Sequence, residues 1–157
     1  MEPRVNYQTA PDAIKGMFEL ERYIHTCGLD QKLIHLIKTR ASQLNGCAFC
    51  IDMHTRDARA LGETEQRLYA LDAWRETPFF TDQERAALAW AEALTNIQQG
   101  HAPDEVYQEL ARHYSEQEIV ALTIAITTIN AWNRIAVGFR AVPGSYQPQQ
   151  QKTHAAA

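Results

Sequence analysis

Apolar residues recur every three or four positions along almost the whole chain, and no stretch shows the sustained alternation of a β-strand. Spacing of this kind predicts amphipathic helices. The predicted helices cover residues 12–27, 31–44, 47–62, 65–74, 82–98, 103–113 and 116–140. The pattern therefore predicts an all-α fold of about six to seven helices, formed by a single domain over residues 1–146.

Helix boundaries are marked by residues with known capping or turn preferences. Asn45-Gly46 ends one helix, because both residues tolerate positive φ. Thr81 and Ser115 are each followed three residues later by glutamate, which is the capping-box pattern of a helix start. Residues 147–157 are polar and low in complexity, so we expect a disordered tail.

The longest apolar stretch, Ile119 to Val137, has the length of a membrane span. Asn130, Asn133 and Arg134 interrupt it, and an arginine deep in hydrocarbon is costly. A buried core helix is therefore the better interpretation, and no membrane partner is expected. The first residues contain no apolar segment typical of a secretory signal, so we expect a cytoplasmic protein.

Composition and cysteine count exclude some classes of partner and point to a function for two cysteines. Apolar residues make up 45% of the chain and charged residues 22%, as in ordinary globular proteins. The net charge of -4, without any run of lysine or arginine, argues against nucleic acid as a partner. The three cysteines are an odd count, and Cys47 and Cys50 form a C-x-x-C pair. In a reducing compartment such a pair is more often catalytic or metal-binding than structural.

Cys47, Cys50 and His54 are spaced to share one face of a helix. At about 100° per residue, Cys50 lies about 60° and His54 about 20° from Cys47 around the axis. Because Asn45-Gly46 precedes the pair, the cysteines occupy the helix start, where free N–H groups and the helix dipole favour a thiolate. His54 can exchange a proton or, as an imidazolium, stabilise the thiolate. One thiol can then attack an oxidant and the other close a disulfide, but the spacing leaves open which one attacks.

Three other interpretations of this cluster stay open. Both cysteines could be ordinary core residues, as buried cysteines often are. The pair could serve a redox-responsive binding protein with little turnover. Cys47, Cys50, His54 and His35 could also ligate zinc, although three ligands from one short helix make an awkward site.

Several segments together resemble the AhpD-like alkylhydroperoxidases of the carboxymuconolactone decarboxylase family. The specific one is residues 40–54, which read RASQLNGCAFCIDMH. Residues 57–62, 68–75, 84–90 and 129–134 extend the likeness, which covers about residues 15 to 145. The resemblance implies an all-helical fold that assembles into homo-oligomers, commonly trimers or hexamers.

The same resemblance implies a thiol peroxidase or disulfide reductase with no bound cofactor beyond a Cys47–Cys50 disulfide. Cys50 would attack the peroxide, Cys47 would resolve the sulfenate, and His54 would belong to a proton relay. The implied partners are an organic hydroperoxide or a disulfide as substrate, and a protein or small thiol as reductant. The decarboxylase branch lacks the cysteine pair, so lactone decarboxylation is not expected.

The chain departs from the family pattern in the relay. Twelve residues before the first cysteine the family usually has a glutamate, and this chain has His35. A histidine still shuttles protons but brings no fixed negative charge. Some relatives carry a histidine before the second cysteine, where this chain has Phe49.

Other polar and reactive residues have less specific expectations. We expect Cys27 to be a packed or half-exposed thiol, and Asp52 and Asp57 to be solvated or paired with Arg56 or Arg59. Asn130, Asn133 and Arg134 are expected to tie helices or subunits together, because buried polar groups need partners.

Overall fold

The computed structural model describes residues 2–148, so the predicted tail lies outside the described residues from 149 onward. Within that range the chain forms α-helices and short 3-10 helices, and no strand. The α-helices are α1 (Pro11–Thr26), α2 (Gln31–Leu44), α3 (Ala48–Ala60), α4 (Glu65–Ala70), α5 (Asp82–Thr95), α6 (Asp104–His113) and α7 (Glu116–Phe139). The 3-10 helices are η1 (Tyr7–Thr9) and η2 (Leu71–Glu76). The all-α prediction is confirmed.

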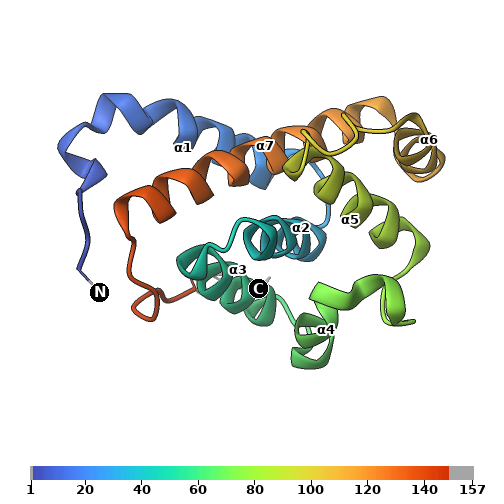
Figure 1. Cartoon of the computed structure of the whole chain (residues 1–157), viewed down its shortest axis with the longest axis horizontal. Coiled ribbons are helices and arrows are strands. Elements are labelled where there is room, and N and C mark those ends of the chain that lie inside the picture. The colour runs from blue at the N-terminus through green and yellow to red at the C-terminus, as the bar shows by residue number, and fades with distance from the viewer. Residues whose placement is uncertain (1, 149–157) are drawn as a thin grey trace, which may run out of the picture.

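Helix α2 is the centre of the molecule. Its residues from Leu33 to Ser42 are all buried, and it packs against α3, α5 and α7. Figure 1 shows α1 and α7 side by side along one face, with α2 and α3 beneath them and α5 and α6 toward one end. A helix buried on every side must satisfy its polar groups within the protein, and α2 carries His35, Lys38 and Arg40 in this stretch.

Both predicted capping boxes are present. The Thr81 hydroxyl accepts from the backbone N–H of Glu84, whose carboxylate accepts from the N–H of Thr81. Ser115 and Glu118 repeat this arrangement at the start of α7. Each helix therefore begins where the sequence pattern places it.

Two predicted helices differ from the observed ones. The segment predicted as one helix over 65–74 is divided into α4 and η2, with Ala73 outside helical geometry. The helix predicted to reach residue 98 ends at Thr95, and the following loop places His101 and Ala102 at positive φ. In both places an apolar helical pattern continues past the point where the backbone turns.

Helix α7 is long and apolar enough to cross a membrane by length and composition alone. Its buried side chains instead pack with α1, α2 and α5, and they include Leu122, Ile126 and Ile129, each fully buried. The prediction of a core helix is confirmed by these contacts.

Candidate functional site

The turn before α3 places the two cysteines. Gly46 has φ +66°, and the backbone N–H of Cys47 donates to the carbonyl of Ser42 at 2.9 Å. Cys47 is the N-cap of α3, and its sulfur accepts from the N–H of Cys50 at 3.3 Å. The predicted helix start is thus confirmed within one residue, with Cys47 capping the helix and Cys50 inside its first turn.

An amide cluster fastens this turn to α7. The Nδ2 atom of Asn45 lies 2.9 Å from Oδ1 of Asn130 and 2.8 Å from Oδ1 of Asn133. Asn133 in turn donates to the hydroxyl of Ser42 at 3.0 Å, and Asn130 to that of Thr95. These asparagines tie helices together as predicted, whereas Arg134 is exposed and bonds only Asn130 of its own helix among the described residues.

Cys47 and Cys50 are joined by a disulfide, with Cα atoms 5.4 Å apart. The spacing prediction that the two sulfurs meet is therefore confirmed. In this state the sulfurs are bonded to each other, so the zinc site predicted as an alternative, with both cysteines as ligands, is not formed.

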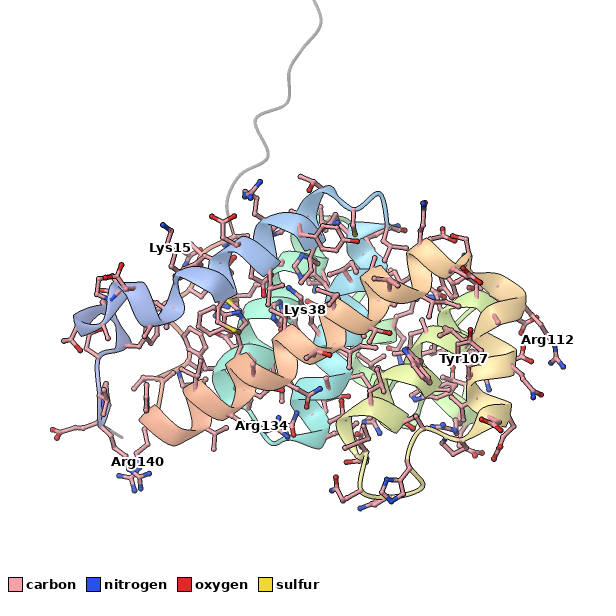
Figure 2. The ribbon with its side chains drawn as sticks, turned by 90° about the horizontal axis from the view of Figure 1, so that it is seen from above. Lys15, Lys38, Tyr107, Arg112, Arg134 and Arg140 are labelled. Atoms are coloured by element: carbon pink, nitrogen blue, oxygen red, sulfur yellow. A yellow bond between two sulfur atoms is a disulfide. The ribbon has the colours of Figure 1, made fainter. Side chains whose placement is uncertain are left out.

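The disulfide lies between α3 and α7, and both cysteines are only 1% exposed. Figure 2 shows the molecule from above, with α1 and α7 running across the face that covers α2 and α3. Ala41 and Ile129 are buried against the disulfide, and Phe49, Trp132 and Ala136 are partly buried around it. The rings of Tyr7 and Phe18 pack against Trp132, so the N-terminal segment contributes to the cover. A reactant reaches the sulfurs only when some of these side chains move.

His54 lies one turn beyond Cys50 on α3 and meets His35 of α2. Their Nδ1 atoms are 3.3 Å apart, and both side chains are buried. This contact joins two residues that the sequence analysis selected for different reasons. The Nε2 atom of His54 is buried and has no hydrogen-bond partner among residues 2–148.

Both histidines are held neutral. Burial, with lesser contributions from the nearby positive charges of Lys38 and His25, lowers the pKa of His35 to about 3. The same causes, with His35 added, lower the pKa of His54 well below its ordinary value. In the disulfide state both rings are therefore weak bases, and an imidazolium at His54 is disfavoured.

Three residues that the sequence analysis did not assign to the site surround this histidine pair. Lys38 lies one turn from His35 on α2, is 2% exposed and pairs with Glu21 of α1 at 2.5 Å. Asp57 lies one turn beyond His54, and its carboxylate accepts from the Tyr146 hydroxyl at 2.7 Å. The i, i+3 spacing of His54 and Asp57 was visible in the sequence. The contacts of Lys38 and Tyr146 join distant segments and had no local signal.

Asp52 pairs with Arg56 as predicted, whereas Asp57 is partly buried and pairs with neither neighbouring arginine. Arg56 pairs with Asp52 and Arg59 with Glu65, so Asp57 has no cationic partner within the described part of the chain. Burial raises the pKa of Asp57, against the lowering effect of the Tyr146 hydrogen bond. A partly buried carboxyl group that forms no salt bridge among the described residues thus lies beside two neutral imidazoles, and the charge of Lys38 acts to lower its pKa.

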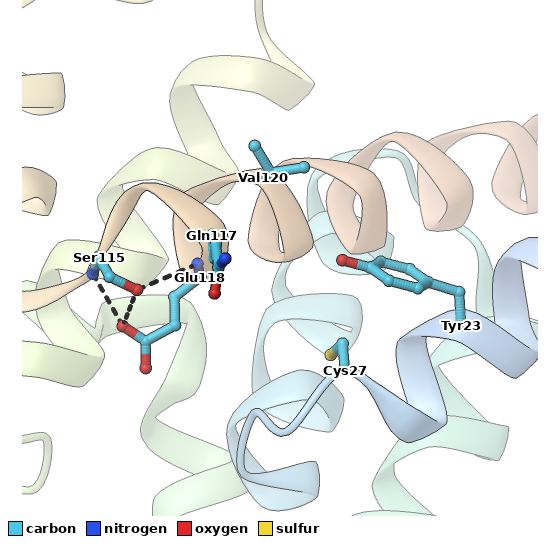
Figure 3. Close-up of a pocket in the computed structure, with 6 residues that line it drawn as sticks. All are labelled: Tyr23, Cys27, Ser115, Gln117, Glu118 and Val120. Atoms are coloured by element: carbon cyan, nitrogen blue, oxygen red, sulfur yellow. Dashed lines mark hydrogen bonds between the residues drawn. The ribbon is translucent and has the colours of Figure 1, made fainter.

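A hollow of about 610 Å³ lies elsewhere, between the end of α1 and the start of α7. Figure 3 shows its lining, with Tyr23 and Cys27 from the α1 side and Val120 from α7. Cys27 is a half-buried free thiol, as predicted, and it donates to the carbonyl of Ile24. None of the four predicted site residues lines this hollow.

Comparison with known proteins places these features in a family. A model of the carboxymuconolactone decarboxylase family matches residues 10–93. The uncharacterised protein YdfG of Bacillus subtilis is 47% identical over 138 residues, which are 87% of this chain and 94% of YdfG. The uncharacterised protein YnjA of Escherichia coli is 32% identical over 98 residues, or 62% of this chain and 53% of YnjA.

Solved structures agree with the sequence comparison. A crystallised protein of unknown function from Agrobacterium tumefaciens, with a suggested role as the antioxidant defence protein AhpD, is 47% identical with a TM-score of 0.89. The match covers 92% of this chain and all of that one. The debrominase Bmp8 shares the fold alone, at 24% identity and a TM-score of 0.79 over 88% of this chain and 74% of its own. The chain is thus an AhpD-like member of the carboxymuconolactone decarboxylase family.

Proposed function

We propose that this protein is a thiol–disulfide oxidoreductase that reduces organic hydroperoxides through Cys47 and Cys50. The observation that carries the proposal is the Cys47–Cys50 disulfide at the start of α3, one helical turn from the His54–His35 pair. A redox couple, a thiolate-stabilising helix start and two proton-exchanging groups are the parts that such a reaction needs.

The cycle begins with the reduced protein. The thiolate of Cys50 attacks one peroxide oxygen, the O–O bond breaks, and the departing alkoxide takes a proton and leaves as an alcohol. Cys50 then carries a sulfenic acid, which the Cys47 thiolate attacks, so that the disulfide forms and water leaves. A dithiol reductant reopens the disulfide by thiol–disulfide exchange and is itself oxidised.

The histidine pair would supply and collect the protons of this cycle. A neutral imidazole accepts the proton of a reacting thiol on one nitrogen while it donates from the other. The contact between the Nδ1 atoms of His54 and His35 at 3.3 Å offers such a path from α3 to α2. His35 thereby takes the place where the family usually has a glutamate, and it transfers protons without adding a negative charge.

The assignment of attack to Cys50 rests on the family resemblance. The geometry gives one argument for Cys47 and one for Cys50. Cys47 is the N-cap, and its sulfur accepts the N–H of Cys50, which stabilises a thiolate at Cys47. Cys50 lies one turn from His54, which favours proton removal from Cys50. We assign attack to Cys50, and the variants described below separate the two orders.

Burial of the disulfide favours a second candidate function, that of a redox-responsive binding protein with little turnover. Both cysteines are 1% exposed, so opening of the Trp132 cover limits access. If that opening is slow, the pair records the redox state without consuming peroxide. The two functions share the same residues and differ in rate.

Three further properties belong to this proposal. The substrate would be an organic hydroperoxide or a disulfide, reduced at the expense of a protein or small thiol in the cytoplasm. No resident metal or cofactor takes part in the cycle. Copies of the chain would associate as trimers or hexamers, supported by the apolar side chains that α1 and α7 expose, among them Phe18, Tyr23, Val120 and Val137.

Consumption of cumene hydroperoxide or t-butyl hydroperoxide with a dithiol reductant tests the proposal. Wild type should turn over, Cys50→Ser should consume no peroxide, and Cys47→Ser should react once and stop with a sulfenic acid. Cys27→Ser is the matched control and should keep full activity. Exchange of the phenotypes of Cys47→Ser and Cys50→Ser would reverse the assigned order. If wild type consumes no peroxide or disulfide, the enzyme proposal fails and the redox-responsive function remains.

A further inference from the structure

His35, His54 and Asp57 form a compact set of donor groups. One ligand atom from each lies within 4.8 Å of the other two. His54 and Asp57 are i and i+3 on α3, and His35 faces them from α2. A pair at this spacing on one helix, completed by a residue of a facing helix, is how helical proteins build metal sites.

The spacing of the two imidazoles fits a shared ion. In a tetrahedral zinc site with metal–nitrogen bonds of about 2.05 Å, two ligand nitrogens lie about 3.3 Å apart. The Nδ1 atoms of His35 and His54 are 3.3 Å apart.

The unpaired carboxyl group of the cluster also suits a cation. Asp57 forms no salt bridge in the described part of the chain, because Arg56 and Arg59 pair with other carboxylates. A divalent cation held by the two Nδ1 atoms would give this carboxylate a cationic partner.

The residues around the cluster hold the Asp57 carboxylate in place and leave a path by which a cation can enter. The Tyr146 hydroxyl donates to one carboxylate oxygen of Asp57, which leaves the other oxygen for a metal and fixes its direction. Asp57 is only partly buried, so a cation can enter from its side. The Lys38 ammonium opposes a cation nearby, but Glu21 neutralises much of its charge.

We propose that His35, His54 and Asp57 bind one divalent transition-metal ion of the Zn²⁺ class, with water completing the coordination. Two imidazoles and one carboxylate are the ligand types of such ions. The site lies beside the cysteine pair and uses neither sulfur, unlike the zinc site predicted from the sequence. A bound cation engages both imidazoles and so removes them from proton transfer.

Cobalt(II) titration of the oxidised chain tests the site. The sample is the untagged Cys27→Ser protein with the Cys47–Cys50 disulfide closed, so no free thiol is present. We expect one Co²⁺ per chain, with visible d–d absorption, no thiolate charge-transfer band, and displacement by Zn²⁺. No turnover is measured, so the result does not depend on the peroxidase proposal.

Variants identify the ligands. His54→Ala should weaken Co²⁺ binding more than 100-fold, Asp57→Asn at least 10-fold, and Tyr146→Phe about 10-fold as a supporting group. His113→Gln is the control, because His113 and Glu109 form a surface pair that could hold a cation weakly. Circular dichroism and thermal unfolding check that each variant is folded. If His54→Ala does not fold, Asp57→Asn and Tyr146→Phe still test the site, because both change partly exposed positions. Absence of binding in the oxidised parent, or binding that only His113→Gln removes, would overturn the proposal.

Discussion

Helix α2 buries two polar groups five residues apart, and they differ in how fully they are satisfied. Arg40 donates from Nε to Glu92 of α5 at 2.7 Å and also pairs with Asp72. Glu92 accepts further from the indole N–H of Trp74 at 2.9 Å and pairs with Arg75. Among the described residues the His35 ring hydrogen-bonds only to another neutral ring, whose far nitrogen has no partner there.

The difference separates a structural cluster from a reactive one. In the Arg40–Glu92 cluster both carboxylate oxygens of Glu92 are engaged by Arg40, Trp74 and Arg75, so any new ligand of Glu92 would have to break a bond. In the His35–His54 cluster Nε2 of His54 has no partner among the described residues, and burial holds the rings uncharged. Burying unsatisfied groups costs free energy, and such groups are found where a ligand or a proton uses them. Polar burial on one helix therefore stabilises the fold at Arg40 and is available for chemistry at His35.

Glu92→Ala should cause the largest loss of stability. It leaves Arg40, which is 8% exposed, and the Trp74 indole without their shared acceptor. Removal of one partner from a buried ion pair costs about 3 kcal/mol. Urea unfolding should show that loss, while the folded fraction keeps its peroxide turnover. Arg22→Ala, at an exposed pair with Glu19, is the control and should change little. Equal stability of Glu92→Ala and wild type would mean that the cluster is not structural.

His54→Leu should show the opposite behaviour. The substitution places an apolar side chain of similar size at this position and removes the ring that exchanges protons. We expect turnover to fall about 100-fold, or about 2.7 kcal/mol in activation free energy, because general acid–base catalysis contributes at least that much. The free energy of unfolding should fall by only about 1 kcal/mol, because the 3.3 Å contact with Nδ1 of His35 is the hydrogen bond lost and Nε2 of His54 has no partner among the described residues. Peroxidase kinetics and urea unfolding on one preparation measure both.

His113→Leu is the matched control for this result. His113 is half-buried and pairs with Glu109 on its own helix, far along the chain from the cysteines. Its loss should leave turnover unchanged. A His54→Leu protein with full turnover and a large loss of stability would show that the histidine pair is structural, and the comparison of the two clusters would fail.

The sequence predicted those parts of the site that share one helix. Cys47, Cys50 and His54 follow the helical period, and Asn45-Gly46 and the two capping boxes mark boundaries through local chemistry. The contact with His35 was reached through family resemblance, because no local pattern reports which helices face each other. Tyr146 and Asp57 meet across 89 positions, and Asn45 and Asn133 across 88. Such contacts depend on tertiary packing, and helical periodicity carries no information about them.

Asn45→Ala extends the comparison to a third polar cluster, at the C-terminal end of α2. Asn45 donates to Asn130 and Asn133, and the substitution leaves the buried Oδ1 of Asn133 without this donor. We expect a loss of about 1–2 kcal/mol in the free energy of unfolding. Thr127→Ala is the control, because Thr127 is exposed and bonds only the carbonyl of Thr123 on its own helix. A loss no larger than that of the control would show that satisfied polar groups on this helix contribute little.

The smallest expected effect is the pH dependence of the Arg40–Glu92 cluster. Burial alone would raise the pKa of Glu92, but hydrogen bonds from Trp74, Arg75 and Arg40 outweigh it and lower the pKa below that of an ordinary glutamate. For a carboxyl with a lowered folded-state pKa, the stabilisation is present above the unfolded-state value of about 4.3. It is lost as the pH falls through the folded-state value. The midpoint of thermal unfolding should therefore be higher for wild type than for Glu92→Gln at pH near 7, and the difference should shrink as the solution becomes more acidic than about pH 4. A difference that is constant across this window would mean that the Glu92 charge does not stabilise the cluster, and that its hydrogen bonds and packing alone hold Arg40 in place.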